Sequence, residues 1–141
     1  MPRYGFLSWT DDRIIATVET VQRELTVDGL VLRYTTEDTG LNVDGVQGSE
    51  GAFVATSFWL AEAPHELDRG AEAIELFERL LSLRNDVGLL SEEDDPATRH
   101  HLGNTPQAFS HAAVVTTALR LSNQPSQQLT RTEALEQEAA S

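Results

Sequence analysis

Apolar and polar positions along the chain predict four helices, two of which are amphipathic. Residues 11–25 carry apolar side chains at spacings of four, three and four, which form one stripe along a helix: Ile14, Val18, Val21 and Leu25. Residues 68–84 carry a second apolar stripe, formed by Ile74, Phe77, Leu80 and Leu81. Acidic and basic side chains lie on the opposite face of this helix. Both helices are expected to bury one face and to expose the other.

The other two predicted helices, residues 51–63 and 106–121, are apolar around most of their circumference. The first carries no charge over its first eleven residues, and His111 is the one ionisable side chain in the first fourteen residues of the second. A helix that is apolar on every side is buried on every side. Pro64 is expected to end or kink the first of these helices, and Pro106 suits the first turn of the second.

The order amphipathic, buried, amphipathic, buried predicts an all-α fold of two outer–inner helical hairpins, as in part of an α/α barrel or toroid. A four-helix bundle would instead show one apolar stripe on each helix. Connections of more than twenty residues, 26–49 and 85–105, precede the two buried helices, so both should gather on one rim, where function is expected. Residues 1–122 are expected to form this domain, and residues 123–141 a flexible polar tail.

Composition narrows the classes of partner. The net charge of −13, from 23 acidic and 10 basic residues, argues against nucleic acid and anionic membrane surfaces. No apolar run approaches the roughly 18–20 residues of a membrane helix, and no secretory signal follows Met1, so a soluble, cytoplasmic protein is expected. The chain has no cysteine, and its histidines lack the ligand spacing of a zinc site, so we expect neither a disulfide nor a bound metal.

Four consecutive acids, residues 92–95, lie in the second long connection. Neighbouring carboxylates repel one another, so at least one pKa should be raised if one of the four is buried. A pair of carboxylates facing a pocket is what glycoside cleavage needs. The same run could instead be a solvated acidic turn that Pro96 ends, and the residues alone leave both interpretations open.

The first long connection offers a possible sugar-binding group. Arg33, next to Tyr34, presents several donors in a fixed fork, which fits a polyol or a carboxylate. Glu50 comes at the start of a predicted buried helix, where the helix dipole favours an anion. Two structural alternatives remain open, namely that Glu50 only caps that helix and that Arg33 only pairs with a nearby acid.

Five motifs resemble bacterial family 15 glycoside hydrolases and follow one another in the same order as in that family. They are residues 29–34, 50–53, 57–60, 85–93 and 102–111. The resemblance extends from about residue 4 to residue 121. It implies an (α/α)6 barrel, which agrees with the alternation of the helices. It also implies hydrolysis of α-glucosidic bonds, in starch-like glucans, other α-glucans or trehalose, with inversion at the anomeric carbon and no organic cofactor.

The resemblance implies a role for each candidate residue. The acid that follows serine in Leu-Ser-Glu, Glu92, matches the general base that activates the attacking water. Arg33 and Tyr34 match a substrate-binding pair at the sugar pocket, and Glu50 and Phe53 match positions of the pocket wall.

Family members are several times longer, and their general acid lies in the part that precedes these motifs. The chain is therefore expected to be a C-terminal barrel segment, truncated or split, that does not cleave glycosides alone. Its expected partners are an α-glucoside or α-glucan and an N-terminal barrel fragment, or a second copy bound through faces that an open ring exposes. The alternative is a non-catalytic remnant that binds sugar or another helical protein.

Overall fold

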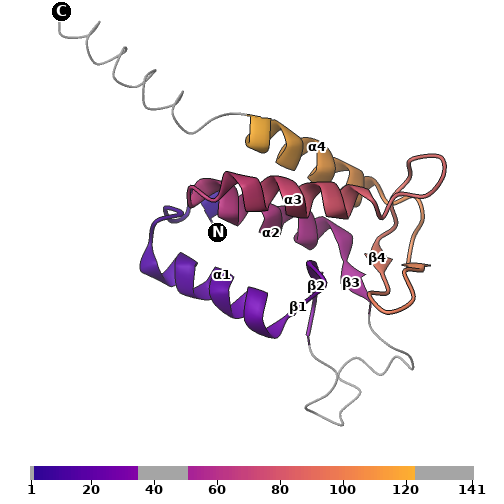
Figure 1. Cartoon of the computed structure of the whole chain (residues 1–141), viewed down its shortest axis with the longest axis horizontal. Helices are drawn as coiled ribbons and strands as arrows, with labels where there is room; N and C mark the ends of the chain where they lie inside the picture. Colours follow the sequence, from indigo (N-terminus) through magenta and orange to yellow (C-terminus); the bar gives the residue numbers. More distant parts are fainter. Residues whose placement is uncertain (1, 35–50, 123–141) are drawn as a thin grey trace, which may run out of the picture.

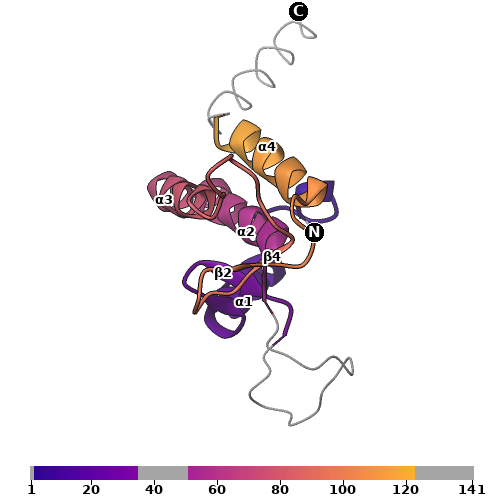
Figure 2. The same ribbon diagram turned by 90° about the vertical axis from the view of Figure 1, so that its right-hand side faces the viewer.

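The computed structural model describes residues 2–34 and 51–122, so Glu50 and the predicted tail lie outside the described residues. Within these ranges the chain forms a short 3-10 helix, η1, and four α-helices: η1 (Pro2–Tyr4), α1 (Asp12–Glu24), α2 (Val54–Glu66), α3 (Gly70–Leu81) and α4 (Ala108–Ser122). Helix α2 packs against both α3 and α4, and α1 lies on the opposite side of α2 from α4 (Figure 1 and Figure 2). None of the described helices is long and apolar enough to cross a membrane.

Helix α2 is buried on all sides, as its uniformly apolar sequence predicts. Nine of its thirteen residues are buried: Val54, Ala55, Ser57, Phe58, Leu60, Ala61, Glu62, Ala63 and Pro64. The predicted end at Pro64 is wrong, because the helix continues to Glu66. Packing against α3 and α4 outweighs the one backbone hydrogen bond that proline cannot donate.

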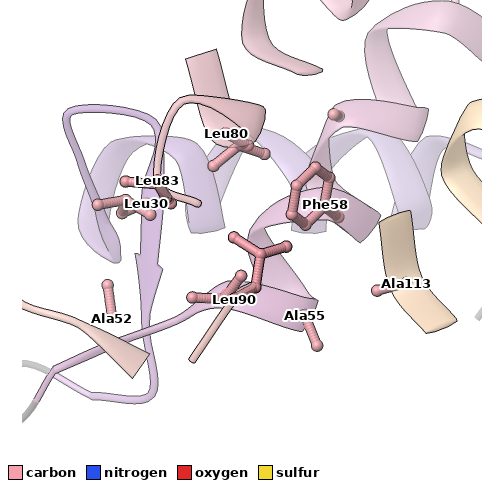
Figure 3. Close-up of a cluster of buried hydrophobic side chains, with 10 residues drawn as sticks. Leu30, Ala52, Ala55, Phe58, Leu80, Leu83, Leu90 and Ala113 are labelled. Atoms are coloured by element: carbon pink, nitrogen blue, oxygen red, sulfur yellow. The ribbon is translucent and has the colours of Figure 1, made fainter. Parts of the chain in front are cut away.

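The core is centred on Phe58 of α2, which is fully buried (Figure 3). Its ring meets the ring of Phe77 of α3 edge to face, with centroids 5.6 Å apart. Buried side chains from the strands, from α3 and the loop that follows it, and from α4 complete the cluster: Leu30, Ala52, Leu80, Leu83, Leu90 and Ala113. One hydrophobic core therefore joins elements from both halves of the chain.

The amphipathic predictions for α1 and α3 are confirmed, with one correction. Helix α1 has no fully buried residue, and its apolar stripe is half-buried. In α3 the buried residues are Ala73 and Leu80, whereas Ile74 is 50% exposed. The predicted position of Ile74 in the inner stripe is wrong because Ala73, which shares a face with Phe77 and Leu80, takes the inner position.

Helix α4 departs from the prediction that it has no solvent face. Its buried residues are small or polar, namely Ser110, Ala113 and Thr117. The larger apolar side chains of Phe109, Val115 and Leu119 are 50%, 58% and 60% exposed. The ring of Phe109 still meets Trp59 of α2 edge to face, with centroids 5.3 Å apart. Val115 and Leu119, four residues apart, share a face that α2 and α3 leave without a cover within the described part of the chain.

Pro106 is not in the first turn of α4, which begins at Ala108. The preceding peptide bond, Thr105–Pro106, is cis. The proline therefore belongs to the connection that leads into the helix, and its predicted role as a first helical residue is wrong.

The two long connections form a five-stranded antiparallel sheet, which the all-α prediction did not include, together with residues 52–53, where the sequence predicts the start of a helix. Its strands pair in sequence order: β1 (Thr26–Val27), β2 (Leu30–Leu32), β3 (Ala52–Phe53), β4 (Glu93–Asp94) and β5 (His101–Leu102). Strand β3, which leads directly into α2, pairs with β2 of the first connection and β4 of the second. The prediction that both connections gather at the N-terminal ends of the buried helices is therefore confirmed.

A buried charge network ties the N-terminal residues to α2 and α4. Glu62 of α2 is fully buried, and its carboxylate accepts hydrogen bonds from Arg3 and, at 2.8 Å, from the hydroxyl of Thr117. Nε of Arg120 lies 3.4 Å from the other carboxylate oxygen of Glu62. The guanidinium of Arg3 also lies 5.1 Å from the ring centroid of Trp59. A buried carboxylate needs such partners, and here they fix η1 against the ends of two helices.

Replacement of Phe58 tests the position of the core. Phe58→Ala is expected to lower the free energy of unfolding by about 3–5 kcal/mol, because it removes a fully buried ring and leaves a cavity. The matched change Phe6→Ala removes a ring that is 76% exposed and should cost less than about 0.5 kcal/mol. Denaturant unfolding measures both, and equal losses would contradict a core centred on Phe58.

Candidate active site

Three predicted site residues lie together beside β3. The guanidinium carbon of Arg33 is 5.6 Å from the ring centroid of Phe53 and 5.9 Å from that of Tyr34. Nη2 of Arg33 is 3.9 Å from Oε1 of Glu93, whose side chain is 16% exposed. The structure therefore brings a cation, two aromatic rings and an acid into one cluster.

Strand register explains this cluster. Phe53 is paired with Val31 of β2 on one side and with Glu93 of β4 on the other, so these side chains share a face of the sheet. Arg33 comes two residues after Val31 and falls on the same face. The buried hydroxyl of Ser57 accepts a hydrogen bond from the amide of Val31 at 2.9 Å and donates one to the carbonyl of Phe53 at 2.7 Å. The first turn of α2 thus holds β2 and β3 in register.

Glu92 directly precedes Glu93 in the second long connection, and its hydrogen-bond partner is Asn104. The backbone amide and the side-chain amide of Asn104 donate hydrogen bonds to Oε2 of Glu92 at 3.2 and 2.7 Å. The amide of Glu92 in turn donates to the carbonyl of Asn104 at 2.9 Å. The carbonyl of Glu92 accepts from the amide of Val54 at 3.1 Å. Glu92 is therefore held between the start of α2 and the segment that leads to α4.

Each of the two glutamates lies against a glycine. A Cβ on Gly51 would lie 2.8 Å from Oε2 of Glu93, and one on Gly103 would lie 2.9 Å from Oε2 of Glu92. Gly103 also has a φ of +69°, which side chains rarely adopt. The backbone can approach both carboxylates this closely only because these two positions lack side chains.

The structure settles part of what the sequence left open. Glu93 and the fully buried Asp94 form a strand, so a wholly solvated acidic turn is wrong for these two residues. Arg33 does pair with an acid, and that acid is Glu93 rather than Glu92. The importance of Glu93 and Asn104 could not be inferred from residue type alone, although both lie within the motifs that carry the resemblance. The position of Glu50 remains a prediction.

The sequence-predicted pKa shift occurs at Asp94. Burial raises the pKa of this carboxyl above its ordinary value, and the charge of neighbouring Asp95 raises it further, while His101 and Arg99 oppose the shift. The hydroxyl of Thr98 and the amide of Ala97, in contrast, lower the pKa of Asp95. Adjacent acids therefore titrate differently because one is buried and the other is hydrogen-bonded at the surface.

The histidines have structural partners. Nε2 of His111 accepts a hydrogen bond from the amide of Leu90 at 3.2 Å. Nε2 of His101 lies 2.6 Å from the carbonyl oxygen of Leu83. In residues 2–34 and 51–122 no group of three or more His, Asp and Glu could hold a metal ion, and the absence of a metal site from the whole chain stays a prediction.

Known proteins similar to the chain are glycosidases. The family model described as glycosyl hydrolases family 15 matches residues 1–119. A trehalase from Mycolicibacterium smegmatis is 49% identical over 110 residues, which are 78% of this chain and 16% of that protein. A trehalase from Thermoplasma volcanium is 36% identical over 121 residues, which are 86% of this chain and 19% of that protein. The chain thus spans less than a fifth of the length of these relatives.

A solved structure titled "Glycosidase Wild Type" is similar in fold, with a TM-score of 0.67 at 21% identity. The similarity covers 86% of this chain and 34% of that one. It confirms the predicted fold class, a partial (α/α)6 barrel, to which the five-stranded sheet is a small addition.

Replacement of Asp94 is expected to raise the free energy of unfolding near pH 7, because Asp94→Asn removes a charge that burial disfavours. The raised pKa means that, above the ordinary value of 3.8, the folded chain keeps a proton that the unfolded chain has released. As the pH rises from the ordinary pKa to the raised pKa of folded Asp94, the free energy of unfolding therefore falls. Asp94→Asn has no titrating group at this position, so the variant should not show that fall. Denaturant unfolding at a series of pH values from about 3 to 7 measures the difference.

The neighbouring residue provides a control of opposite sign. Hydrogen bonds lower the pKa of Asp95. Its stabilising contribution to the free energy of unfolding is therefore present above the ordinary pKa and is lost as the pH falls. Asp95→Asn should therefore lower the free energy of unfolding near pH 7. Shifts in the same direction for both variants would show that the two carboxyls do not differ as described.

Proposed function

The chain belongs to glycosyl hydrolase family 15, and we propose that it supplies the general base and one wall of the sugar pocket of an α-glucosidase-type hydrolase. The observation that carries this proposal is the fixed carboxylate of Glu92, held by Asn104 at the rim where both long connections meet. Trehalose is the proposed substrate, because the similar proteins of known activity described above are trehalases. Other α-glucosides or α-glucans are the alternative within the same reaction class.

Glu92 would act on water in an inverting reaction. Both hydrogen bonds to its carboxylate from the described residues go to Oε2, which leaves Oε1 for a water molecule. The base takes a proton from that water, the water oxygen bonds to the anomeric carbon, and the bond from this carbon to the leaving oxygen breaks. A general acid on the opposite face must protonate the leaving oxygen, at a carboxyl separation of about 6.5–9.5 Å.

Arg33 and its neighbours would bind the sugar. The guanidinium presents donors for hydroxyl groups, and the rings of Phe53 and Tyr34 present apolar faces for the pyranose. Oε1 of Glu93 lies 3.9 Å from Nη2 of Arg33 and pairs with the guanidinium. We propose Glu50 as a further pocket-wall residue on the basis of the family motif alone.

The general acid would come from another part of the barrel. The chain matches less than a fifth of the length of the trehalases, so most of the barrel lies outside the matched region of these relatives. The exposed apolar face of α4 that Val115 and Leu119 form supports docking of such a barrel segment. Self-association through the same face is the alternative.

Mutation of Glu92 tests the catalytic proposal. The chain alone is expected to show no turnover of trehalose or maltooligosaccharides, whereas co-expression with the preceding barrel segment of a family 15 trehalase should give turnover. In that assembly Glu92→Gln should lower kcat about 10²- to 10⁴-fold, because the amide cannot take a proton from water. Steady-state assays measure kcat and KM separately.

The matched control is Glu78→Gln, which makes the same change at an exposed position of α3. It should leave kcat unchanged. Robust turnover by the chain alone would refute the need for an acid from elsewhere, and full activity of Glu92→Gln in the assembly would refute its role as the base. Maltose binding without turnover in any assembly would favour a non-catalytic sugar-binding protein.

A charge on the exposed face of α4 tests the docking proposal. Val115→Glu should weaken binding of the barrel segment about tenfold or more, because it buries an unpaired charge in the interface. The matched change Val87→Glu lies at a residue that is 70% exposed and does not belong to α4, and it should have no effect. Analytical ultracentrifugation measures both, and concentration-dependent dimers lost only in Val115→Glu would indicate self-association instead.

A further inference from the structure

A polar hollow lies on the face of β4 opposite to the cluster of Arg33, Phe53, Tyr34 and Glu93. Glu93 and Asp94 are consecutive in β4, so their side chains point to opposite faces of the sheet. Asp94 lines an open hollow of about 370 Å³, which is within the range of small-molecule sites, about 300–1,000 Å³. Its lining is mostly polar and includes these residues: Ser82, Arg84, Asn85, Asp94, Arg99 and His101.

The carboxylate of Asp94 has an unmet hydrogen-bonding requirement. The residue is 1% exposed, and its Oδ1 is buried without a hydrogen-bond partner. Buried polar atoms are nearly always hydrogen-bonded, since an unpaired one costs about 1–3 kcal/mol. A donor in the hollow that approaches Oδ1 would meet this requirement.

The other lining residues limit what that donor can be. The guanidinium groups of Arg84 and Arg99 border the same hollow, so an ammonium group would meet cationic neighbours. An anion would place its charge against the carboxylate of Asp94. A neutral hydroxyl satisfies both constraints, because it donates to the carboxylate, while an adjacent hydroxyl accepts from a guanidinium.

We propose that this hollow is a second sugar-binding site, which takes a pair of neighbouring hydroxyls between Asp94 and Arg99. It is distinct from the proposed active site, because none of Arg33, Tyr34, Phe53 and Glu92 lines the hollow. The proposal requires only binding of a neutral sugar and does not depend on the catalytic role of Glu92.

Contacts within the chain hold the lining residues of the hollow in place. The ring of His101 is held by the carbonyl of Leu83 at 2.6 Å, which joins β5 to the end of α3. Arg84 donates from Nη1 to the carbonyl of Leu81 at 2.9 Å. Nη1 of Arg99 is 3.6 Å from Oδ2 of Asp28. Groups held in place in this way lose little freedom when a ligand binds.

The test is a titration of the full 141-residue chain, labelled with ¹⁵N, with glucose. Saturable shifts are expected for the amides of Arg84, Asp94, Arg99 and His101. Asp94→Asn should raise the Kd about tenfold or more, because it removes a charged acceptor. Arg99→Gln should also weaken binding, and it serves as the second variant if Asp94→Asn does not fold.

Control variants separate the hollow from the proposed active site. Asp86→Asn makes the matched change at an exposed residue outside the lining and should leave the Kd unchanged. Shifts that disappear in Arg33→Gln would belong to the active site and would overturn the second site, whereas shifts that persist in that variant support it whatever the activity of the assembly. Tighter binding of inorganic phosphate or methylammonium than of glucose, or no saturable shift with glucose, would also overturn it.

Discussion

The structure depends on one constraint, which is that α2 has no side that can face water. Strand β2, helix α3 and helix α4 each cover part of it, and their buried residues meet around Phe58. The one fully buried charge on α2, Glu62, is held by groups from η1 and α4. Every element of the described fold therefore contacts this helix or the sheet that leads into it, and α1 does so through β1.

The same constraint gives the site its rigidity. Loops alone would hold Arg33 and Glu92 loosely, because neither belongs to a long regular element. The first turn of α2 connects to both, through Ser57 to the strand before Arg33 and through the amide of Val54 to the carbonyl of Glu92. The buried helix is thus the common support for the cation and the carboxylate.

What could be predicted from the sequence follows from this burial. Periodicity records which face of a helix is covered, so it indicated the alternation of amphipathic and buried helices and the rim where the connections meet. Strands of two or three residues are too short to show a period, and the bond between Glu92 and Asn104 joins residues twelve apart. The pattern predicts Ile74 rather than Ala73 at the inner face of α3, because a larger side chain gives a stronger apolar signal than the small residue that fits beside α2.

The exposed face of α4 has a different origin and bears on the site. Its sequence is that of a helix covered all round, but in the described structure Val115 and Leu119 are more than half exposed. Full burial of one such side chain contributes about 1.5–3 kcal/mol, so a partner that covers both would stabilise α4 appreciably. The first turn of α4 also holds the connection that carries Glu92, since the hydroxyl of Ser110 donates to the carbonyl of Ser91 at 2.7 Å. The proposed docking on α4 and the position of Glu92, the proposed base, are therefore linked, because the same helix makes both contacts.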